Sequence, residues 1–301
     1  MALRCDACAA VGETRRTAPL RGAGRRAIPL AKPARAGLRR SSEAHSAETR
    51  PMFDPVRPFG APGSHVAQGG QAIYGAPLGI LMLEARFPRV HGDMGNATTW
   101  PFPVLYHVVR GASPAKVVCD RAEGLLAPFI AAARDLVDLG AGGITTSCGF
   151  LSIYQRQLAD AVQVPVATSS MMQVPWVQAT LPPGQRVGII TINAAGITPA
   201  HLEGINVPLD TPIAGCEGGT ELFEVIINAA RPQLDLARAC ADVVAAAQAL
   251  VARHPELGAI VLECTNMAPY SAAVRAATGL PVYDIYSMTT WFQAGLQPRR
   301  F

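Results

Sequence analysis

Residues 142–176 read GGITTSCGFLSIYQRQLADAVQVPVATSSMMQVPW, and residues 258–292 repeat the pattern without a gap as GAIVLECTNMAPYSAAVRAATGLPVYDIYSMTTWF. In both copies an isoleucine comes four residues before a cysteine, and a proline, a methionine and an aromatic residue follow that cysteine at 17, 24 and 28 residues. The matched pairs are Ile144/Ile260, Cys148/Cys264, Pro165/Pro281, Met172/Met288 and Trp176/Phe292. A repeat of this length predicts two homologous halves related by a pseudo-twofold axis.

Short apolar runs surround this repeat and alternate with longer helical patterns, such as residues 122–140 and 221–254, where Pro232 is expected to separate two helices. The runs are mostly continuous rather than alternating, which is typical of parallel strands covered on both faces. They lie at residues 78–83, 103–109, 142–147, 165–170, 186–192, 211–215, 258–263 and 281–287. The sequence therefore predicts an α/β fold with two pseudo-symmetric, Rossmann-like parallel-sheet lobes and the active site in the cleft between them.

The charge of the first fifty residues differs from that of the rest of the chain. Residues 1–51 hold ten Arg and one Lys against four acidic residues, whereas 52–301 hold 15 basic and 18 acidic residues. We interpret residues 1–70 as a disordered basic extension, in preference to a nucleic-acid-binding or targeting tail. One origin for it is a start codon chosen upstream of Met52. The lobes are predicted at 71–185 and 186–301, with the option that the end of the first packs on the second.

Composition excludes several protein classes. Half of the residues are hydrophobic, yet no apolar run reaches the roughly 18–20 residues that a membrane helix needs, so neither a membrane nor a nucleic-acid partner is expected. Seven cysteines, without a secretory signal, indicate free thiols in a cytoplasmic protein rather than a disulfide framework. Cys5 and Cys8 form a CxxC without a second ligand pair, so no metal is predicted.

Cys148 and Cys264 carry the predicted chemistry. Each comes directly after a predicted strand, where parallel sheets place their ligand crevice, and each precedes a predicted helix whose N-terminus is expected to lower the thiol pKa. If the two halves face one another, one thiolate can remove a Cα proton while the other thiol protonates the opposite face. The pair thus predicts inversion of a stereocentre without pyridoxal phosphate.

The motifs TTSCGF around Cys148 and LECTNM around Cys264 resemble the aspartate/glutamate racemase superfamily, which includes hydantoin racemases, maleate cis–trans isomerases and arylmalonate decarboxylases. The resemblance covers roughly residues 77–292. It implies two catalytic cysteines, a small carboxylate-bearing substrate, no organic cofactor and a homodimer. Amino-acid racemases usually have Cys-Asn-Thr at the first motif, whereas Gly149 and Phe150 follow Cys148 here, so we expect a substrate other than aspartate or glutamate.

Polar residues near the two cysteines are candidates for binding the substrate. The hydroxyls of Ser147 and Thr265 and the amide of Asn266 suit carboxylate oxygens, although the same residue types also cap helices. The further candidates are Gly149 beside Cys148, Asn96 and Thr98 in the loop HGDMGNATTW, and Asn193 after the strand at 186–192. For Asn96 and Thr98, a simple turn is the competing interpretation.

Four functions fit these features. A cofactor-independent racemase or epimerase of an amino acid or derivative uses both cysteines. A maleate-type isomerase uses one cysteine as a nucleophile, and an arylmalonate-type decarboxylase also needs one cysteine. A non-catalytic, two-lobed binding protein is the fourth alternative, because a fold does not establish chemistry.

Overall fold

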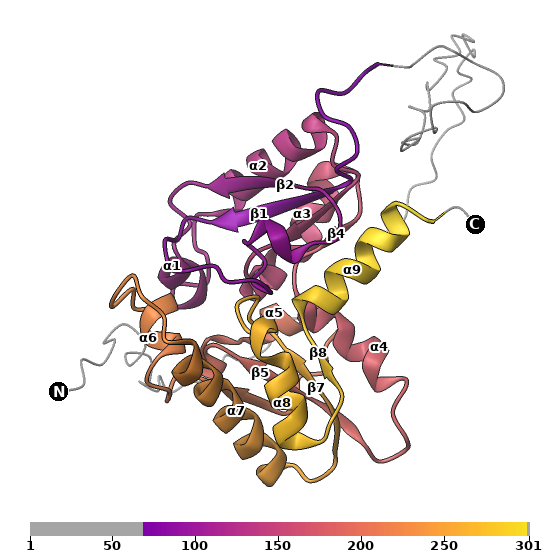
Figure 1. Cartoon of the computed structure of the whole chain (residues 1–301). Helices are drawn as coiled ribbons and strands as arrows, with labels where there is room; N and C mark the ends of the chain where they lie inside the picture. The colour runs from indigo at the N-terminus through magenta and orange to yellow at the C-terminus, as the bar shows by residue number, and fades with distance from the viewer. Residues whose placement is uncertain (1–68, 300–301) are drawn as a thin grey trace, which may run out of the picture. The chain divides into compact units, whose positions relative to one another are not determined.

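The computed structural model describes residues 69–299 (Figure 1). The predicted extension at 1–70, with Cys5 and Cys8, lies outside the described residues apart from Gly69 and Gly70. Among the described residues, no helix is long and apolar enough to cross a bilayer.

Two four-stranded parallel sheets form the framework, and their strands are connected in the same order, β2-β1-β3-β4 and β6-β5-β7-β8. The strands of the first sheet are β1 (Leu78–Leu83), β2 (Val104–Val109), β3 (Gly143–Thr146) and β4 (Val166–Ala167). Those of the second are β5 (Arg186–Thr191), β6 (Ile213–Gly215), β7 (Leu257–Leu262) and β8 (Val282–Tyr283). The predicted α/β fold with two lobes is confirmed.

The register of the strands repeats the symmetry of the sequence. In the first sheet Ile144 of β3 lies opposite Gly79 of β1, and in the second Ile260 of β7 lies opposite Gly188 of β5. All six residues of β1 and all six of β7 are buried, as expected for parallel strands covered on both faces. The carboxyl ends of β3 and β7, which lead to the two cysteines, are therefore equivalent points of the two lobes.

Helices cover the sheets, and their ends follow local sequence signals. α2 ends at Gly140, which adopts the left-handed conformation that glycine favours, and Asp235 caps α7 by accepting from two backbone N–H groups. Pro232 lies between α6 and α7, as predicted. The α-helices are α1 (Pro114–Val118), α2 (Leu126–Leu139), α3 (Gln155–Val162), α4 (Val174–Gln178), α5 (Pro199–Glu203), α6 (Leu222–Ile226), α7 (Leu236–Arg253), α8 (Ser271–Thr278) and α9 (Ile285–Leu296). Short 3₁₀ helices are η2 (Ala97–Thr99), η3 (Gly149–Tyr154), η4 (Ser170–Gln173), η5 (Ala194–Gly196) and η6 (Ala268–Tyr270).

Two predicted strands are shorter than expected. The prediction of a strand at 281–287 is wrong beyond Tyr283, because Asp284 caps α9 and accepts from the backbone N–H of Ser287 at 2.9 Å. The run at 165–170 forms only the two residues of β4 before η4 begins. In both copies a capping side chain ends the strand and starts a helix.

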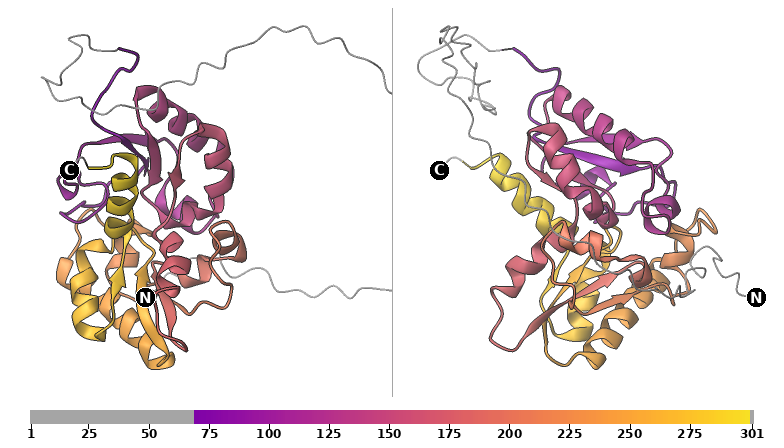
Figure 2. Two further views of the ribbon diagram at one scale, coloured as in Figure 1. Left: turned by 90° about the vertical axis from the view of Figure 1, so that its right-hand side faces the viewer. Right: turned by 180° about the vertical axis from the view of Figure 1, so that it is seen from behind.

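The segment after the last strand of each lobe packs on the other lobe's sheet. Met171 and Val174, from η4 and α4, are buried against Val187 and Ile189 of β5. In return, residues of α9 join the apolar cluster that contains Leu78 and Ile80 of β1. Figure 1 shows α9 beside the first lobe and α4 beside the second, and Figure 2 shows both from other sides. This exchange couples the two lobes.

Replacing Ile285 tests that coupling. The side chain is 0% exposed against the first sheet, so Ile285→Ala should lower the free energy of unfolding by about 2–5 kcal/mol because it leaves a cavity. The matched control is Ile73→Ala, whose side chain is 39% exposed and which should change stability by about 0.5 kcal/mol or less. Urea denaturation of both variants measures the difference, and equal losses would contradict this packing.

Candidate active site

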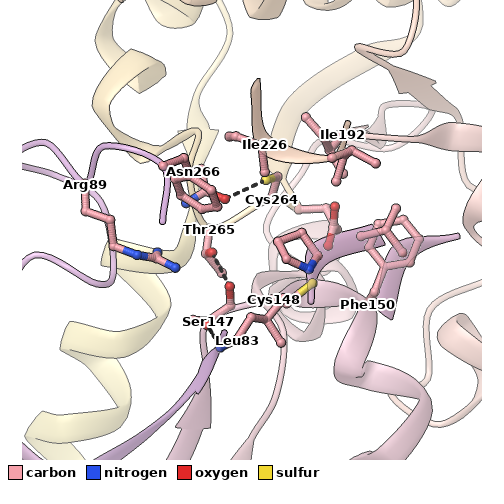
Figure 3. Close-up of a pocket in the computed structure, with 15 residues that line it drawn as sticks. Leu83, Arg89, Ser147, Cys148, Phe150, Ile192, Ile226, Cys264, Thr265 and Asn266 are labelled. Atoms are coloured by element: carbon pink, nitrogen blue, oxygen red, sulfur yellow. Dashed lines mark hydrogen bonds between the residues drawn. The ribbon is translucent and has the colours of Figure 1, made fainter. Parts of the chain in front are cut away.

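Cys148 and Cys264 line one pocket between the lobes, each two residues beyond the end of its strand, β3 or β7. The pocket encloses about 340 Å³ of space between atoms, part of it open to solvent. Figure 3 shows the two thiols on different sides of it, with Arg89 on one flank and Phe150 on the other. The structure thus brings the predicted pair together.

The pocket wall has an apolar and a polar part. Apolar side chains come from both lobes: Leu83, Phe87, Pro114, Val118, Phe150, Ile192, Ile226 and Ile227. The polar residues are Arg89, Ser147, Glu263, Thr265 and Asn266, besides the cysteines. Few polar groups on a mostly apolar wall are typical of a small-molecule site, in which they fix the orientation of the ligand.

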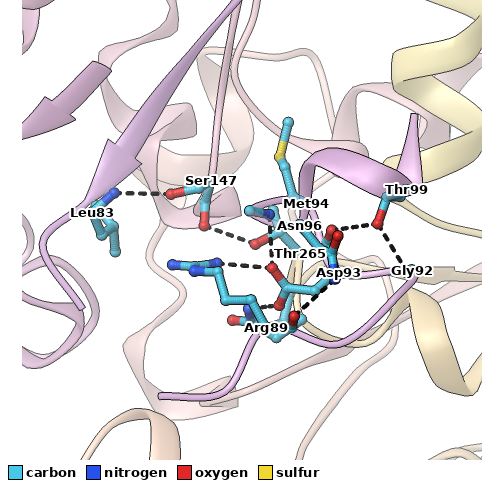
Figure 4. Close-up of polar contacts among 12 residues, drawn as sticks. Leu83, Arg89, Gly92, Asp93, Met94, Asn96, Thr99, Ser147 and Thr265 are labelled. Atoms are coloured by element: carbon cyan, nitrogen blue, oxygen red, sulfur yellow. Dashed lines mark hydrogen bonds and ion pairs between the residues drawn. The ribbon is translucent and has the colours of Figure 1, made fainter. Parts of the chain in front are cut away.

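The residues next to the cysteines contact one another across the lobes in a reciprocal way. Thr265, which follows Cys264, donates its hydroxyl to the carbonyl oxygen of Ser147, which precedes Cys148, at 2.7 Å (Figure 4). Conversely, Glu263, which precedes Cys264, packs its carboxyl group against Gly149, which follows Cys148. These two contacts fix the relative position of the two strand ends and therefore of the two thiols.

Ser147 and Thr265 lie on the pocket wall as predicted, but their oxygens already have partners. The Ser147 Oγ accepts from the backbone N–H of Leu83 at 2.9 Å, which leaves its own proton free to be donated. The Thr265 hydroxyl proton is used in the contact between the lobes. Of the two hydroxyls, Ser147 is therefore the one able to donate to a ligand.

A chain of polar contacts leads from Arg89 to one of the cysteines. Arg89 Nη1 lies 2.9 Å from Asp93 Oδ1, and the other oxygen of Asp93 accepts from Asn266 Nδ2 at 2.5 Å. The Oδ1 atom of Asn266 in turn lies 3.6 Å from the sulfur of Cys264, which donates to it. Arg89 also stacks over the ring of Phe87, with 4.6 Å between the guanidinium carbon and the ring centre. Asn266 thus orients the Cys264 thiol, and Arg89 brings a guanidinium to the same flank of the pocket.

Glu263 is a buried carboxyl group on the pocket wall. Its side chain is 0% exposed, and Thr191 Oγ1 donates to its Oε2 at 2.7 Å. Its Oε1 has no hydrogen-bond partner among the described residues. Burial raises the pKa of Glu263 to about 7, although the bond from Thr191 works in the opposite direction. Near neutral pH this group therefore changes its charge readily.

Both thiols are more weakly acidic than a free cysteine, which corrects the expectation that a helix N-terminus lowers their pKa. Burial is the main cause of the raised pKa of Cys148 and of Cys264, and the negative charge of Glu263 adds to it. The helical turn after Cys148 is a short 3₁₀ helix, and no helix directly follows Cys264. Near neutral pH both cysteines therefore favour the neutral thiol form.

The remaining predicted contacts do not line the pocket. Asn96 caps η2, where its side chain accepts from Thr98 and donates to the carbonyl oxygen of Arg89 at 3.0 Å. This matches the turn interpretation. Asn193 is buried at the start of η5, and Gly149 lies behind the wall against Glu263.

Sequence reasoning missed Arg89, Asp93 and Glu263. Glu263 carried a signal, since it is a charged residue that directly follows the continuous apolar run of β7. Asp93 lies in the loop HGDMGNATTW and Arg89 lies just before it, but nothing in their spacing indicated the ion pair between them. Among residues 69–299, no group of three or more His, Cys, Asp or Glu side chains is placed to hold a metal ion.

Comparison with curated proteins gives clear relatives. The chain is 30% identical over 232 residues to a dimethylsulfoniopropionate lyase of Durusdinium sp. clade D, a match that covers 73% of this chain and 75% of that protein. It is 32% identical over 221 residues to dimethylsulfoniopropionate lyase 3 of Emiliania huxleyi (strain CCMP1516), covering 69% of this chain and 56% of that protein. The chain therefore spans little more than half of the second relative. No known family profile matches it.

Among solved structures, a variant of arylmalonate decarboxylase in a sulfate-associated form superposes with a TM-score of 0.50 at 17% sequence identity. The match covers 73% of this chain and 93% of that one. The likeness establishes a shared fold with arylmalonate decarboxylase, one of the proteins that the sequence resemblance named.

The close packing of Gly149 on Glu263 leads to a stability prediction. A Cβ atom at Gly149 would come within 2.7 Å of the Glu263 carbonyl oxygen, and closer to its carboxyl group, so the wall must shift. Gly149→Ala should therefore cost about 1–3 kcal/mol of stability. Gly218→Ala is the control, because no atom lies within 4 Å of its added Cβ. Thermal unfolding measures both, and an unchanged melting temperature for Gly149→Ala would disprove the contact.

Proposed function

We propose that this chain, which belongs to the family of dimethylsulfoniopropionate lyases, cleaves dimethylsulfoniopropionate by β-elimination, with the thiols of Cys148 and Cys264 as its acid–base groups. The observation that carries the proposal is that both buried thiols line one pocket in a chain 30% identical to such a lyase over 232 residues. The family is one of enzymes, which favours catalysis over the binding protein considered from the sequence.

The reaction needs one proton acceptor next to a bound carboxylate. One cysteine first loses its proton to solvent and, as thiolate, removes a proton from the carbon beside the carboxylate, whose electron pair forms the new carbon–carbon double bond. The bond from the neighbouring carbon to sulfur breaks, and its electrons leave with dimethyl sulfide. The products are dimethyl sulfide and acrylate, and the cysteine keeps the proton until solvent removes it.

The polar flank of the pocket suits the carboxylate. Arg89 offers guanidinium N–H groups beyond the one that contacts Asp93, and Ser147 has a hydroxyl proton to donate. The negative charge of a bound carboxylate is best placed here, on the flank away from Phe150.

The racemase predicted from the sequence is the second candidate, and the same pair of thiols favours it. Its first step is also removal of a proton beside a carboxylate, but the second thiol then returns a proton to the opposite face. Incubation with chiral 2-substituted carboxylates in heavy water distinguishes the two. Deuterium at Cα with inversion of these carboxylates indicates racemisation, whereas release of acrylate from dimethylsulfoniopropionate in a parallel incubation indicates the lyase. The homodimer and the absence of an organic cofactor stay predictions.

Substitution of each cysteine tests the proposal. Cys148→Ser or Cys264→Ser, whichever removes the thiol that acts as the base, should lower kcat for release of dimethyl sulfide by about 100-fold or more, because a serine hydroxyl is a far weaker acid than a thiol. Cys240→Ser is the control, since Cys240 is a half-buried residue of α7 that does not line the pocket. Gas chromatography of dimethyl sulfide, with NMR of acrylate, gives the rates. Full activity in both pocket variants would rule out a cysteine as the base.

A further inference from the structure

The basic and the acidic side chain of the described pocket wall lie toward different ends of the pocket. Arg89 is on one flank (Figure 3), and it is the basic residue among those that line the pocket. Glu263 is the acidic one, and its carboxyl group packs against Gly149, directly before Phe150 on the other flank. A ligand that spans the pocket therefore meets a positive group at one end and a carboxyl group at the other.

The carboxyl group of Glu263 has one oxygen atom that can still interact with a ligand. It is fully buried, Thr191 satisfies only its Oε2, and its Oε1 has no hydrogen-bond partner among the described residues. An unpaired carboxylate oxygen away from water is destabilising, and a cation nearby removes that cost. The packing against Gly149 and the bond from Thr191 hold the group in this position.

The wall around this end selects the kind of cation. Phe150, Ile192 and Ile226 present ring and alkyl surfaces, so a primary ammonium could donate one N–H to Glu263 but would meet apolar side chains with its other N–H donors. A sulfonium or quaternary ammonium group has no N–H donors. The positive charge of the sulfur or nitrogen is spread over the attached alkyl groups, and these groups pack favourably on aliphatic and aromatic surfaces.

We propose that Glu263 is the counter-ion for an alkylated cationic group of the substrate, so that the pocket selects zwitterions with a carboxylate toward Arg89 and a sulfonium or quaternary ammonium toward Glu263. The choice of sulfonium rests on the proposed function, but the charge selection does not depend on bond cleavage. Glu263 then determines specificity, and the same fold without this carboxyl group would accept neutral alkyl carboxylates equally well.

Recognition of a cation by Glu263 makes binding depend on pH. Because burial raises the pKa of Glu263 to about 7, the carboxylate form prevails above that pH and is lost below it. The other titratable groups near it are the thiols of Cys148, Cys216 and Cys264, each with a raised pKa, so they stay neutral through this range. Affinity for a cationic ligand should therefore fall as the pH drops from 8 to 6.

A pair of isosteric ligands tests the proposal. 3-(Trimethylammonio)propanoate and 4,4-dimethylpentanoate have the same shape, but only the first has a positive charge. Isothermal titration calorimetry at pH 8 should show the full chain binding the cationic ligand at least about 10-fold more tightly. In Glu263→Gln this preference should fall to about twofold or less, with the affinity for the neutral ligand unchanged. Glu217→Gln, a change at an exposed carboxylate beside Cys216, should keep the preference.

A second experiment measures binding at different pH values with the unmodified chain, so it does not depend on the folding of any variant. The chain's preference for the cationic ligand should shrink several-fold between pH 8 and pH 6, while the affinity for the neutral ligand stays constant. Equal affinities for the two ligands at pH 8, or a preference that survives in Glu263→Gln, would overturn the proposal.

Failure of this inference is distinguishable from failure of the lyase proposal. Cleavage of dimethylsulfoniopropionate without any preference between the isosteric ligands would leave the lyase standing and overturn the role of Glu263. A preference that depends on Glu263, without cleavage, would support cation recognition and overturn the lyase. Binding of neither ligand would overturn the inference.

Discussion

The contacts between the residues that flank the two cysteines hold the candidate site together. The residue after each cysteine meets the residue before the other: Thr265 donates to the Ser147 carbonyl, and Gly149 makes room for the Glu263 carboxyl group. Because both contacts involve the ends of rigid parallel strands, they fix the two thiols without help from a flexible loop. The exchange of α4 and α9 between the lobes supports the same arrangement from outside. Each lobe thus depends on the other for part of its core and for its half of the site.

Low solvent access makes the pocket electrostatically sensitive. Burial raises the pKa values of both thiols and of Glu263, so the thiols favour their neutral form while Glu263 gains and loses its proton near neutral pH. In such surroundings a single ligand charge changes the balance more than it would in water. A bound cation favours the ionised carboxyl group, while a bound carboxylate beside Arg89 adds negative charge near the thiols. Binding and protonation in this pocket are therefore coupled.

The sequence predicted the fold well because the fold follows from two simple patterns. Continuous apolar runs indicated buried parallel strands, and the repeat indicated two equivalent lobes with Cys148 and Cys264 at matching strand ends. The site was predicted less completely, since its specific features are those in which the two copies differ. Glu263 is the repeat equivalent of Ser147, and a comparison that looks for likeness passes over it, whereas Ser147, Gly149 and Thr265 were recognised as neighbours of the cysteines. The Arg89–Asp93 ion pair depends on how a loop folds, which periodicity does not determine.

Racemisation and β-elimination need similar catalytic groups from the protein, and they differ mainly in the substituent that the substrate carries. Both begin when a base removes the proton beside a carboxylate that a positive flank of the pocket stabilises. If the neighbouring carbon bears a sulfonium group, the electron pair expels it and the second protonation never occurs. Without such a leaving group, the carbanion persists until the facing thiol returns a proton. A two-cysteine pocket can therefore be converted from one reaction to the other by changing which substituent it admits beside the reacting carbon. If this chain selects its substrate in the way proposed above, the selection falls on the wall formed by Phe150, Ile192 and Glu263.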